Sequence, residues 1–306
     1  MGHQTSDVKD LERVVTDTRP EPISISYATI KYITKDFAQV IGVGGFGEVY
    51  LGGHGNWMVA VKKLKSSTDV SNEKFFLDEV NCLMKVKHKN IVRFLGYFAD
   101  TRGEVMEIDG KLRIVEVQQR LLCLEYVPNG NLNILKAEKN HGFEWVVRYQ
   151  IIKGNCQGLH CIHKERINHL DLKPANVLLG TNMEPKITDF GVSRCIGDTE
   201  STMVTRNLFG TPGYIAPEFI DKQHISFKSD IFSLGVIMIN LLMGFEGCII
   251  ENVRMIYQAS IFFKNFFLHQ ILLPVEITIL YNIVVWKLAY SLRSKLLVIL
   301  DAILSV

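Results

Sequence analysis

The chain has 306 residues, and its 34 Lys and Arg nearly balance its 32 Asp and Glu, for a formal net charge of +2. A near-neutral balance does not predict a basic surface for nucleic acid, so we expect no nucleic-acid partner. The length suffices for one large domain or for two lobes that share a cleft. Six scattered cysteines without a Cys-x-x-Cys pair favour reduced thiols over a disulfide framework or a metal site.

Residues 1–25 are expected to form a flexible leader, because the stretch from Met1 to Arg19 is polar and charged and lacks a secretory pattern. The start, Met1 to Ser6, fits the Met-Gly-x-x-x-Ser form of N-myristoylation sites, although Asp7 follows it and an unmodified tail is the alternative. One acyl chain gives only marginal membrane binding. We therefore expect a cytoplasmic protein, with membrane association through an N-terminal myristoyl group as the second option.

Residues 26–127 carry strand patterns with one helix among them. Apolar runs and alternation predict strands in four stretches: 40–52 (a hairpin), 58–62, 91–98 and 121–126. Apolar residues at helical spacing predict a helix from Ser71 to Val86. Charged and apolar residues alternate around Asp109-Gly110, which predicts a surface hairpin insertion over 100–119.

The chain becomes helical after the turn at Pro128-Asn129-Gly130, and the clearest helix is predicted from Phe143 to His163. A β-rich lobe that contains one helix, followed by a helical lobe, belongs to the α+β class. We place the second lobe at 128–250 and treat 251–306 as an atypical hydrophobic tail.

A glycine-rich turn, Gly42-Val43-Gly44-Gly45-Phe46-Gly47, lies between two strand-like runs. The backbone NH groups of such a turn can cover phosphates, but a lone Gly-x-Gly-x-x-Gly is a weak signal. A dinucleotide-binding fold would open a helix directly after the turn. Here Glu48 to Leu51 continues as a strand, which favours a β-hairpin lid. A glycine-rich turn without a ligand is the remaining alternative.

Lys62 follows Gly47 by fifteen residues, on a predicted strand where alternation puts Ala60 and Lys62 on one face. A small residue at 60 leaves room for an adenine, and the ammonium group of Lys62 suits phosphates. Lys63 points to the other face and is expected to be solvated. A register error of one residue would exchange the two lysines.

The most informative stretch runs from His169 to Asn176 and is followed by Asp189-Phe190-Gly191. Asp171, then Asn176 five residues later, then Asp189 thirteen residues further on, fit a phosphoryl-transfer site. In such a site one carboxylate orients the hydroxyl nucleophile, while an amide oxygen and a second carboxylate hold Mg²⁺ on the phosphates. Both candidate metal ligands, Asn176 and Asp189, supply oxygen, which Mg²⁺ prefers.

These motifs, in this order, resemble those of eukaryotic protein kinases. Residues 210–218, Gly-Thr-Pro-Gly-Tyr-Ile-Ala-Pro-Glu, are similar to the peptide-docking end of the kinase activation segment. Ser229 to Val236 is similar to the start of the central buried helix, where Asp230 would brace the catalytic loop through backbone NH groups. The resemblance implies a bilobal α+β fold and a Ser/Thr protein kinase that uses ATP and Mg²⁺ and acts on proteins with Ser or Thr acceptors.

The resemblance also implies roles for individual residues. Asp171 is the candidate catalytic base, and Lys173 is similar to the lysine of Ser/Thr kinases that contacts the γ-phosphate. Lys62 positions the phosphates and is held by Glu79, seventeen residues later on the predicted helix. The implied nucleotide-binding residues are Ile41, Gly42, Val43, Gly44, Gly45, Phe46, Gly47, Val49, Ala60, Lys62, Leu124, Glu125 and Val127.

Within the kinases, the chain most resembles the plant receptor-like and receptor-like cytoplasmic kinases. Four stretches carry this resemblance: 25–37, 41–50, 88–96 and 122–131. By that similarity Leu124 is the gatekeeper, and Glu125 to Val127 form the hinge that hydrogen-bonds adenine. A membrane receptor complex is an implied partner. Because no spanning helix precedes the kinase motifs, we expect a cytoplasmic member or a fragment.

The chain departs from the family pattern at Leu170, where an Arg usually precedes the catalytic Asp. A leucine cannot form the ion pair with a phosphorylated activation loop that an Arg would form. We therefore expect the site to depend little on loop phosphorylation.

The C-terminal part is the second departure, because further amphipathic helices are expected there, one carrying an Arg that pairs with Glu218. Residues 255–306 hold six charged residues among 52, and no uncharged run exceeds 11 residues. A membrane span needs about 18 or more apolar residues. Three interpretations are open: a span, a divergent helical core, and, as the favoured one, an unrelated apolar segment in place of the family's helices.

Loss of those helices would uncover the apolar helix predicted around 232–242. The main hypothesis remains an active kinase, because all the residues that carry the chemistry are present. The alternative is a catalytically impaired, kinase-like scaffold or decoy that retains nucleotide binding.

Replacing Ser201, Thr202 and Thr205 together with Ala tests the interpretation of Leu170. Without an Arg to receive a phosphate, the triple variant should keep its phosphotransfer rate within about threefold of the unaltered chain, a small change against typical activation effects. Steady-state phosphotransfer to a peptide gives the rate. A loss above about 100-fold would contradict the interpretation.

Overall fold

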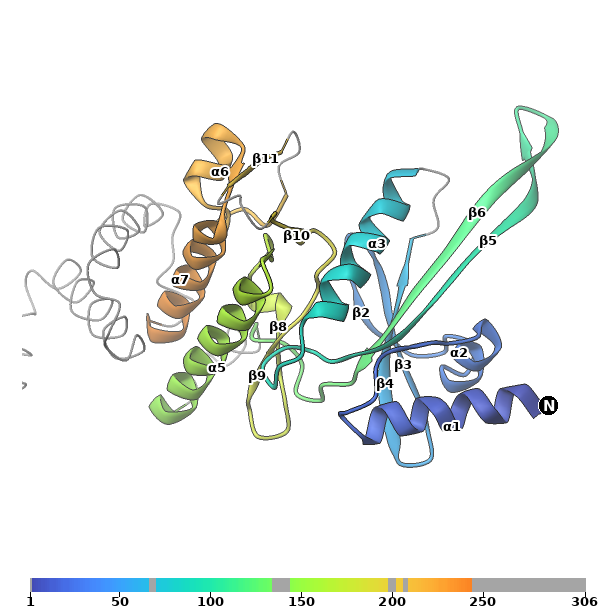
Figure 1. Ribbon diagram of the computed structural model, residues 1–306, viewed down its shortest axis with the longest axis horizontal. Helices are drawn as coiled ribbons and strands as arrows, with labels where there is room; N and C mark the ends of the chain where they lie inside the picture. Colours follow the sequence, from blue (N-terminus) through green and yellow to red (C-terminus); the bar gives the residue numbers. More distant parts are fainter. Residues whose placement is uncertain (1, 66–69, 134–143, 198–201, 206–208, 244–306) are drawn as a thin grey trace, which may run out of the picture.

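A computed structural model of the chain describes residues 2–65, 70–133, 144–197, 202–205 and 209–243. Within these ranges a β-rich lobe with a prominent helix precedes a mainly helical lobe (Figure 1). This arrangement agrees with the predicted α+β, bilobal organisation. The tail at 251–306 lies outside the described residues, as does the end of the second lobe from 244 to 250.

The first lobe is built on a six-stranded sheet with the strand order β1-β5-β6-β4-β3-β2. β1 runs parallel to β5, and the other neighbouring strands are antiparallel. The four predicted strand stretches all contribute to this sheet. Its strands are β1 (Ile23–Ser24), β2 (Val40–Val43), β3 (Gly47–His54), β4 (Trp57–Leu64), β5 (Phe94–Ile108) and β6 (Lys111–Glu125).

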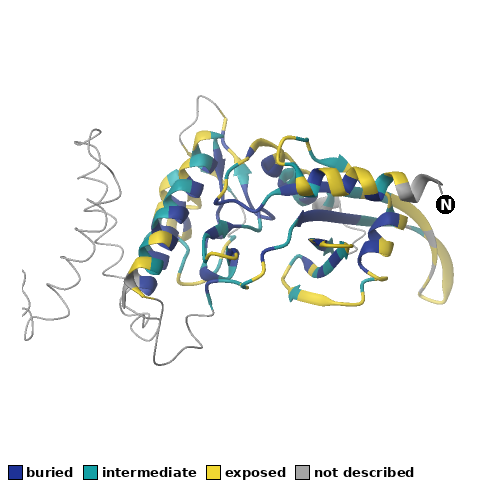
Figure 2. Cartoon of the chain, turned by 90° about the horizontal axis from the view of Figure 1, so that it is seen from below, coloured by how far each residue is buried: buried dark blue, intermediate teal, exposed yellow. Residues whose placement is uncertain are grey.

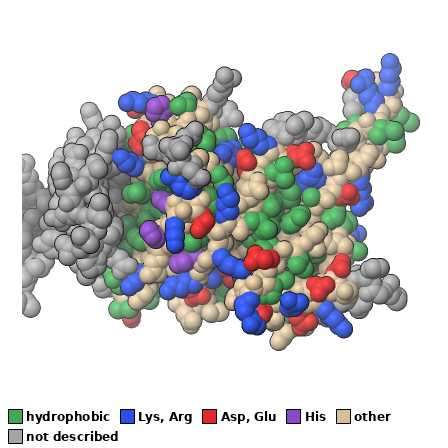
Figure 3. Space-filling view, viewed as in Figure 1, with side chains coloured by type: hydrophobic (Ala, Val, Ile, Leu, Met, Phe, Trp, Pro, Cys, Tyr) green, Lys and Arg blue, Asp and Glu red, His purple; other side chains and the backbone are tan. Residues whose placement is uncertain are grey.

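The predicted insertion at 100–119 is the outer half of a long hairpin formed by β5 and β6, which extends away from the lobe (Figure 1). Asp109 and Gly110 form its turn, with φ values of 51° and 71°. Positive φ at both central residues is what a type I′ hairpin turn requires, and Asp-Gly supplies it at little steric cost. Apolar side chains of the outer half, among them Val105, Leu112 and Ile114, are exposed (Figure 3).

The N-terminal segment differs from the predicted flexible leader. Gly2–Thr16 forms the helix α1, which contacts the helix α2 (Tyr27–Ile33) and the strands β4 and β5. Val8, Leu11 and Val14 of α1 are buried, and Figure 2 shows that buried and exposed positions alternate along this helix. These residues are three positions apart, so they form one apolar stripe along the helix. The segment as a whole is polar and charged, and its composition alone therefore does not indicate this stripe.

Helix α3 (Val70–Lys85) matches the helix predicted in the first lobe, and α5 (Trp145–Lys164) matches the clearest helix predicted in the second. The second lobe also contains α6 (Pro217–Lys222), α7 (Phe227–Met243) and the short 3-10 helix η1 (Pro174–Asn176). Three two-stranded pairs complete it: β7 (Ile167–Asn168) with β10 (Arg194–Cys195), β8 (Val177–Leu179) with β9 (Pro185–Ile187), and β11 (Met203–Val204) with β12 (His224–Ile225).

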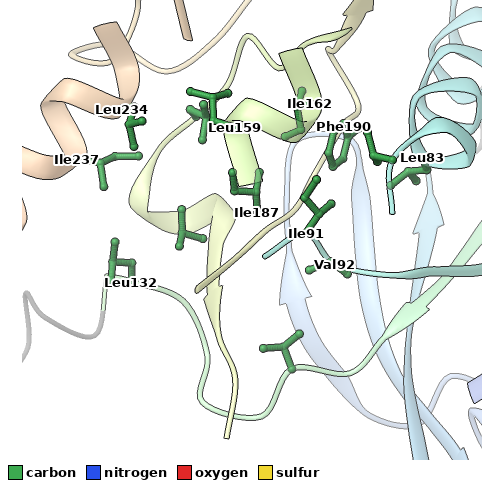
Figure 4. Close-up of a cluster of buried hydrophobic side chains, with 14 of the residues drawn as sticks. Leu83, Ile91, Val92, Leu132, Leu159, Ile162, Ile187, Phe190, Leu234 and Ile237 are labelled. Carbon is green, nitrogen blue, oxygen red and sulfur yellow. The ribbon is translucent and has the colours of Figure 1, made fainter. Parts of the chain in front are cut away.

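A single hydrophobic cluster joins the two lobes (Figure 4). It includes Leu83 of α3, Leu159 of α5, Ile237 of α7 and Phe190, which follows Asp189, and all four are buried. Apolar packing is thus continuous from α3 of the first lobe to α7 of the second. Close packing of this kind holds the two lobes in a defined position relative to each other.

No helix in the described part of the chain combines the length and apolar character needed to cross a membrane.

Truncating a buried side chain of α1 tests whether this helix belongs to the folded unit. Leu11 is 0% exposed, so Leu11→Ala should lower the free energy of unfolding by about 2–5 kcal/mol. Urea unfolding followed by circular dichroism measures it. Glu12→Ala, one residue along and exposed, is the matched control and should change stability by less than about 0.5 kcal/mol. Equal, small effects would contradict the packing.

Candidate active site

The predicted catalytic loop, His169 to Asn176, lies between β7 and β8 and is held from below by α7. Asp230, in the first turn of α7, is fully buried and accepts hydrogen bonds from the backbone NH groups of His169 at 2.7 Å and Leu170 at 2.8 Å. The ring Nε2 of His163 lies 2.9 Å from the same carboxylate. The structure therefore shows the bracing by Asp230 that the sequence resemblance implied.

Asp171 lies at the centre of a compact polar cluster. Lys173 Nζ donates to Asp171 Oδ2 at 2.7 Å, and the Thr211 hydroxyl donates to Asp171 Oδ1 at 2.7 Å. Lys173 Nζ also lies 2.8 Å from Thr211 Oγ1, which closes a triangle. Each oxygen of Asp171 thus has a fixed donor, and the carboxylate is held in one orientation.

Asn176, the last residue of η1, is tied to the same aspartate. Its side-chain nitrogen donates to the Asp171 backbone carbonyl at 2.9 Å and to Asp171 Oδ2 at 3.1 Å. Because the nitrogen is engaged in this way, the amide oxygen is the atom that remains to face a cation.

The loop that carries Asp189 is held against the catalytic loop. Thr188 NH donates to the Asn176 carbonyl at 3.0 Å, and His169 Nε2 lies 3.0 Å from the Thr188 carbonyl. Phe190 is fully buried, with its ring centroid 5.0 Å from that of His169. Asp189 itself adopts a left-handed backbone with φ 67°, which a non-glycine residue rarely does, and this conformation marks functional or strained positions.

Lys62 of β4 links three elements through its ammonium group. Its Nζ lies 2.7 Å from Glu79 Oε1 on α3 and 2.7 Å from Asp189 Oδ1. Lys63 instead places its Nζ 4.7 Å from the ring centroid of Phe37. The predicted register of β4 is therefore the one observed, with Lys62 directed towards Glu79 and Asp189. Lys63 lies against the Phe37 ring, whereas the sequence predicted a solvated side chain.

Burial and charge act in opposite directions on this triad. Burial alone would lower the pKa of Lys62, but Glu79 and Asp189 outweigh it and raise that pKa above its ordinary value. Burial raises the pKa of Glu79, even though Lys62 opposes the change. For Asp189, burial is outweighed by Lys62 and the pKa of the carboxyl is lowered. Asp189 is thus kept ionised, as a cation ligand must be.

The glycine-rich turn connects β2 with β3 as a hairpin, which disagrees with the dinucleotide-binding alternative because no helix follows. Gly47 is required by packing, since a Cβ there would lie 2.1 Å from the Lys63 carbonyl oxygen. Gly45 has no atom within 4 Å of such a Cβ. The fold therefore does not demand glycine at 45, and close approach of another molecule is a sufficient reason for it.

The remaining candidate nucleotide residues lie on β2, β3, β4 and β6. Ala60 of β4 pairs with Leu124 of β6 in the ladder. Leu124 and Val127 are buried, and Glu125 receives hydrogen bonds from Arg93 NH at 2.8 Å and Lys186 Nζ at 3.0 Å. Of the others, Ile41 and Val43 are exposed, whereas Val49 is half-buried.

Leu170 occupies an apolar environment. It is buried, with φ 66°, in a cluster that includes Val192, Phe219 of α6 and Phe232 of α7. The leucine thus contributes packing at a position where an arginine would contribute a charge.

Thr211 is the site residue that sequence reasoning missed. The sequence places Gly210-Thr211-Pro212 only in the activation segment, and the contact of Thr211 with Asp171 spans 40 residues. His163 was missed as well, because a histidine within an amphipathic helix carries no signal of its own. A kinase-specific search for a hydroxyl after the activation loop is the one signal that would have found Thr211.

The fold and this cluster define a protein kinase, and the chain belongs to that family: the family model described as "Protein kinase domain" matches residues 36–304. Membership of this family implies use of ATP and a divalent metal.

Among curated proteins, the chain is 33% identical over 260 residues to cysteine-rich receptor-like protein kinase 34 of Arabidopsis thaliana, covering 82% of this chain and 36% of the relative. It is 34% identical over 249 residues to a G-type lectin S-receptor-like serine/threonine-protein kinase of Arabidopsis thaliana, covering 79% and 26%. Cysteine-rich receptor-like protein kinase 6 of Oryza sativa subsp. japonica is also 34% identical over 249 residues, covering 78% and 32%.

The chain thus spans 26–36% of the length of these relatives. The similarity supports a plant receptor-like Ser/Thr kinase domain with ATP-dependent activity, as the sequence motifs predicted.

Removing the Thr211 hydroxyl tests its positioning role. Thr211→Val keeps the shape but removes both contacts to Asp171 and Lys173, so kcat should fall about tenfold while KM for ATP stays unchanged. Thr211→Ser keeps the hydroxyl and should retain activity within about twofold. Steady-state kinetics with a peptide acceptor separates the two parameters. An unchanged kcat in Thr211→Val would refute the role.

Proposed function

We propose that this chain transfers the γ-phosphate of ATP to Ser or Thr hydroxyls of protein substrates, with Mg²⁺ as the metal. One observation carries the proposal: Lys62 joins Glu79 and Asp189 at 2.7 Å, while Asp171 and Asn176 lie within hydrogen-bond distance of each other. These five residues span 128 positions of the sequence, and the two groups are neighbours because Thr188 NH, next to Asp189, donates to the Asn176 carbonyl at 3.0 Å.

The residues present fit the metal. Asp189 is an ionised carboxylate, and the free oxygen of the Asn176 amide is a second hard ligand, so the pair suits Mg²⁺ better than a soft transition metal. Bound Mg²⁺ supplies positive charge that neutralises the phosphates of ATP. Lys62, held by Glu79, adds a second positive charge beside them.

The acceptor side of the reaction falls to Asp171. Its carboxylate orients the Ser or Thr hydroxyl and accepts its proton, while most of the rate gain comes from positioning. Lys173 donates to the same carboxylate and carries a charge suited to the transferred phosphate. A lysine at this position favours Ser/Thr over Tyr acceptors.

The adenine of ATP would lie against the strands that carry Ala60, Val49 and Leu124, under the glycine-rich hairpin. A small side chain at 60 leaves space for a flat ring, and the segment Glu125 to Val127 offers backbone donors and acceptors along its edge. Gly45, which packing does not require, leaves the hairpin open to the close approach of phosphates.

The names of the relatives favour a place for this domain beside a membrane receptor, either as a membrane-associated or as a cytoplasmic kinase. A receptor complex is accordingly the proposed partner. Myristoylation at Gly2 stays a sequence-based prediction and would give one anchor for such a place.

Two variants separate phosphotransfer from nucleotide binding. Asp171→Asn keeps the size of the side chain but cannot accept a proton, so transfer of radiolabelled phosphate should fall by at least about 100-fold while ATP still raises the thermal midpoint. Asp189→Ala should lose the stabilisation by ATP that depends on Mg²⁺. Glu107→Gln, exposed on the outer half of β5, is the matched control and should behave as the unaltered chain.

Stabilisation by ATP and Mg²⁺ without any transfer in the unaltered chain would overturn the proposal and support the kinase-like scaffold. Removal of divalent metal with a chelator should abolish transfer, and Mg²⁺ should restore it. Restoration by Mn²⁺ alone would contradict the assignment of Mg²⁺.

A further inference from the structure

Two cysteines that the proposed reaction does not use face each other across the junction of the lobes. Cys82 lies on α3 and Cys195 on β10, and their sulfur atoms are 3.9 Å apart although 113 residues separate them in the chain. Both are free thiols. At this distance the two thiols can form a disulfide bond after a small movement.

The two thiols differ in access. Cys82 is 1% exposed, whereas Cys195 is exposed and has Lys85 Nζ 3.6 Å from its sulfur. Cys195 is therefore the thiol of the pair that a dissolved oxidant meets first. A cavity of about 860 Å³ between α3 and the activation segment is lined by both cysteines and by Lys85, so a small oxidant can reach the pair.

The contact between α3 and β10 is built by the residue next to Cys195. The guanidinium carbon of Arg194 lies 5.3 Å from the ring centroid of Phe75 and 5.1 Å from that of Phe209, and its Nη1 lies 3.5 Å from Asp78 Oδ2. These contacts hold β10 beside α3 and so keep the two sulfur atoms near each other.

We propose that Cys82 and Cys195 form a redox site, which hydrogen peroxide oxidises to an intramolecular disulfide that ties α3 to the start of the activation segment. The inference goes beyond phosphotransfer, since the bond forms whether or not the chain is an active kinase.

The exposed thiol reacts first. The Cys195 thiolate attacks one oxygen of hydrogen peroxide, the O–O bond breaks, and the departing hydroxide takes a proton to become water while Cys195 becomes a sulfenic acid. The sulfur of Cys82 then displaces the hydroxyl from the Cys195 sulfur, and the hydroxyl leaves with the thiol proton as a second water. Two thiols lose two electrons and two protons, and one peroxide is reduced to two waters.

Burial and the neighbouring Cys195 raise the pKa of the Cys82 thiol, which fits its part as the second, resolving cysteine. The sulfur atoms must approach from 3.9 Å to about 2.05 Å. β10 is only two residues long, and Cys195 on it is exposed, so this side of the pair has room to move.

The bond would act on the catalytic cleft through short stretches of chain. Cys82 lies three residues after Glu79 on the same helix, and Cys195 lies six residues after Asp189. With the disulfide formed in the observed arrangement, α3 is held where Glu79 pairs with Lys62. Oxidation of the two cysteines would thus restrict the movement of α3, the helix whose Glu79 positions Lys62.

The test uses the full chain, reduced with dithiothreitol, freed of reductant and then treated with hydrogen peroxide. Alkylation followed by mass spectrometry should show four labelled cysteines of the six instead of all six, with Cys82 and Cys195 joined in one non-reduced peptide. Dithiothreitol should restore both thiols. The oxidised chain should unfold at a temperature higher by about 5 °C or more, because the cross-link constrains the unfolded chain.

Cys82→Ser and Cys195→Ser should each abolish the cross-link and the thermal shift, and Cys161→Ser on α5 should abolish neither. Circular dichroism checks the fold, and Cys195→Ser, which changes an exposed side chain, serves if the buried variant fails to fold. The proposal is overturned if both thiols stay alkylatable or if Cys195 is over-oxidised with Cys82 free. A bond to Cys248 or a bond between two chains would overturn it equally.

Discussion

The buried carboxylate of Asp230 is the interaction on which the catalytic loop depends. It is fully buried, accepts hydrogen bonds from the backbone NH groups of His169 and Leu170, and contacts the ring of His163, which is partly exposed. Hydrogen bonds to a charged acceptor contribute about 1.5–3 kcal/mol each, and a buried charge without them would be costly. Leu170 has a left-handed backbone conformation, with φ 66°, so the chain turns at the point where two successive NH groups donate to this carboxylate. The geometry around Asp171 is thus imposed by the central helix of the second lobe.

Local patterns were enough to predict most helices and strands, because turn chemistry and apolar spacing act over a few positions. The Asp109-Gly110 hairpin is one example, since its turn needs only two residues with positive φ. Contacts between distant segments that no motif links could not be predicted from the sequence. The Thr211 hydroxyl meets Asp171 across 40 residues, and Cys82 meets Cys195 across 113, with nothing in either motif to pair them.

The activation segment is anchored at both ends by different forces. Near its start, the guanidinium group of Arg194 lies close to the rings of both Phe75 and Phe209. Near its end, Thr211 contacts the catalytic aspartate, and Ser233 of α7 donates to the Tyr214 carbonyl at 2.6 Å. Leu170 of the catalytic loop packs in one apolar cluster with Val192 and Ala216, so residues of this segment also meet that loop through apolar contact.

Helix α1 has a consequence for where the folding unit begins. The family match starts at residue 36, yet Leu11, Val14 and the neighbouring α2 form one buried cluster with Trp57 and Val59 of β4. A polypeptide cut at the start of the family match would expose to water the apolar side chains of the sheet that α1 and α2 cover. An exposed apolar patch of this kind promotes aggregation. The packed unit of this kinase domain therefore includes α1, which lies ahead of the residues that the family model matches.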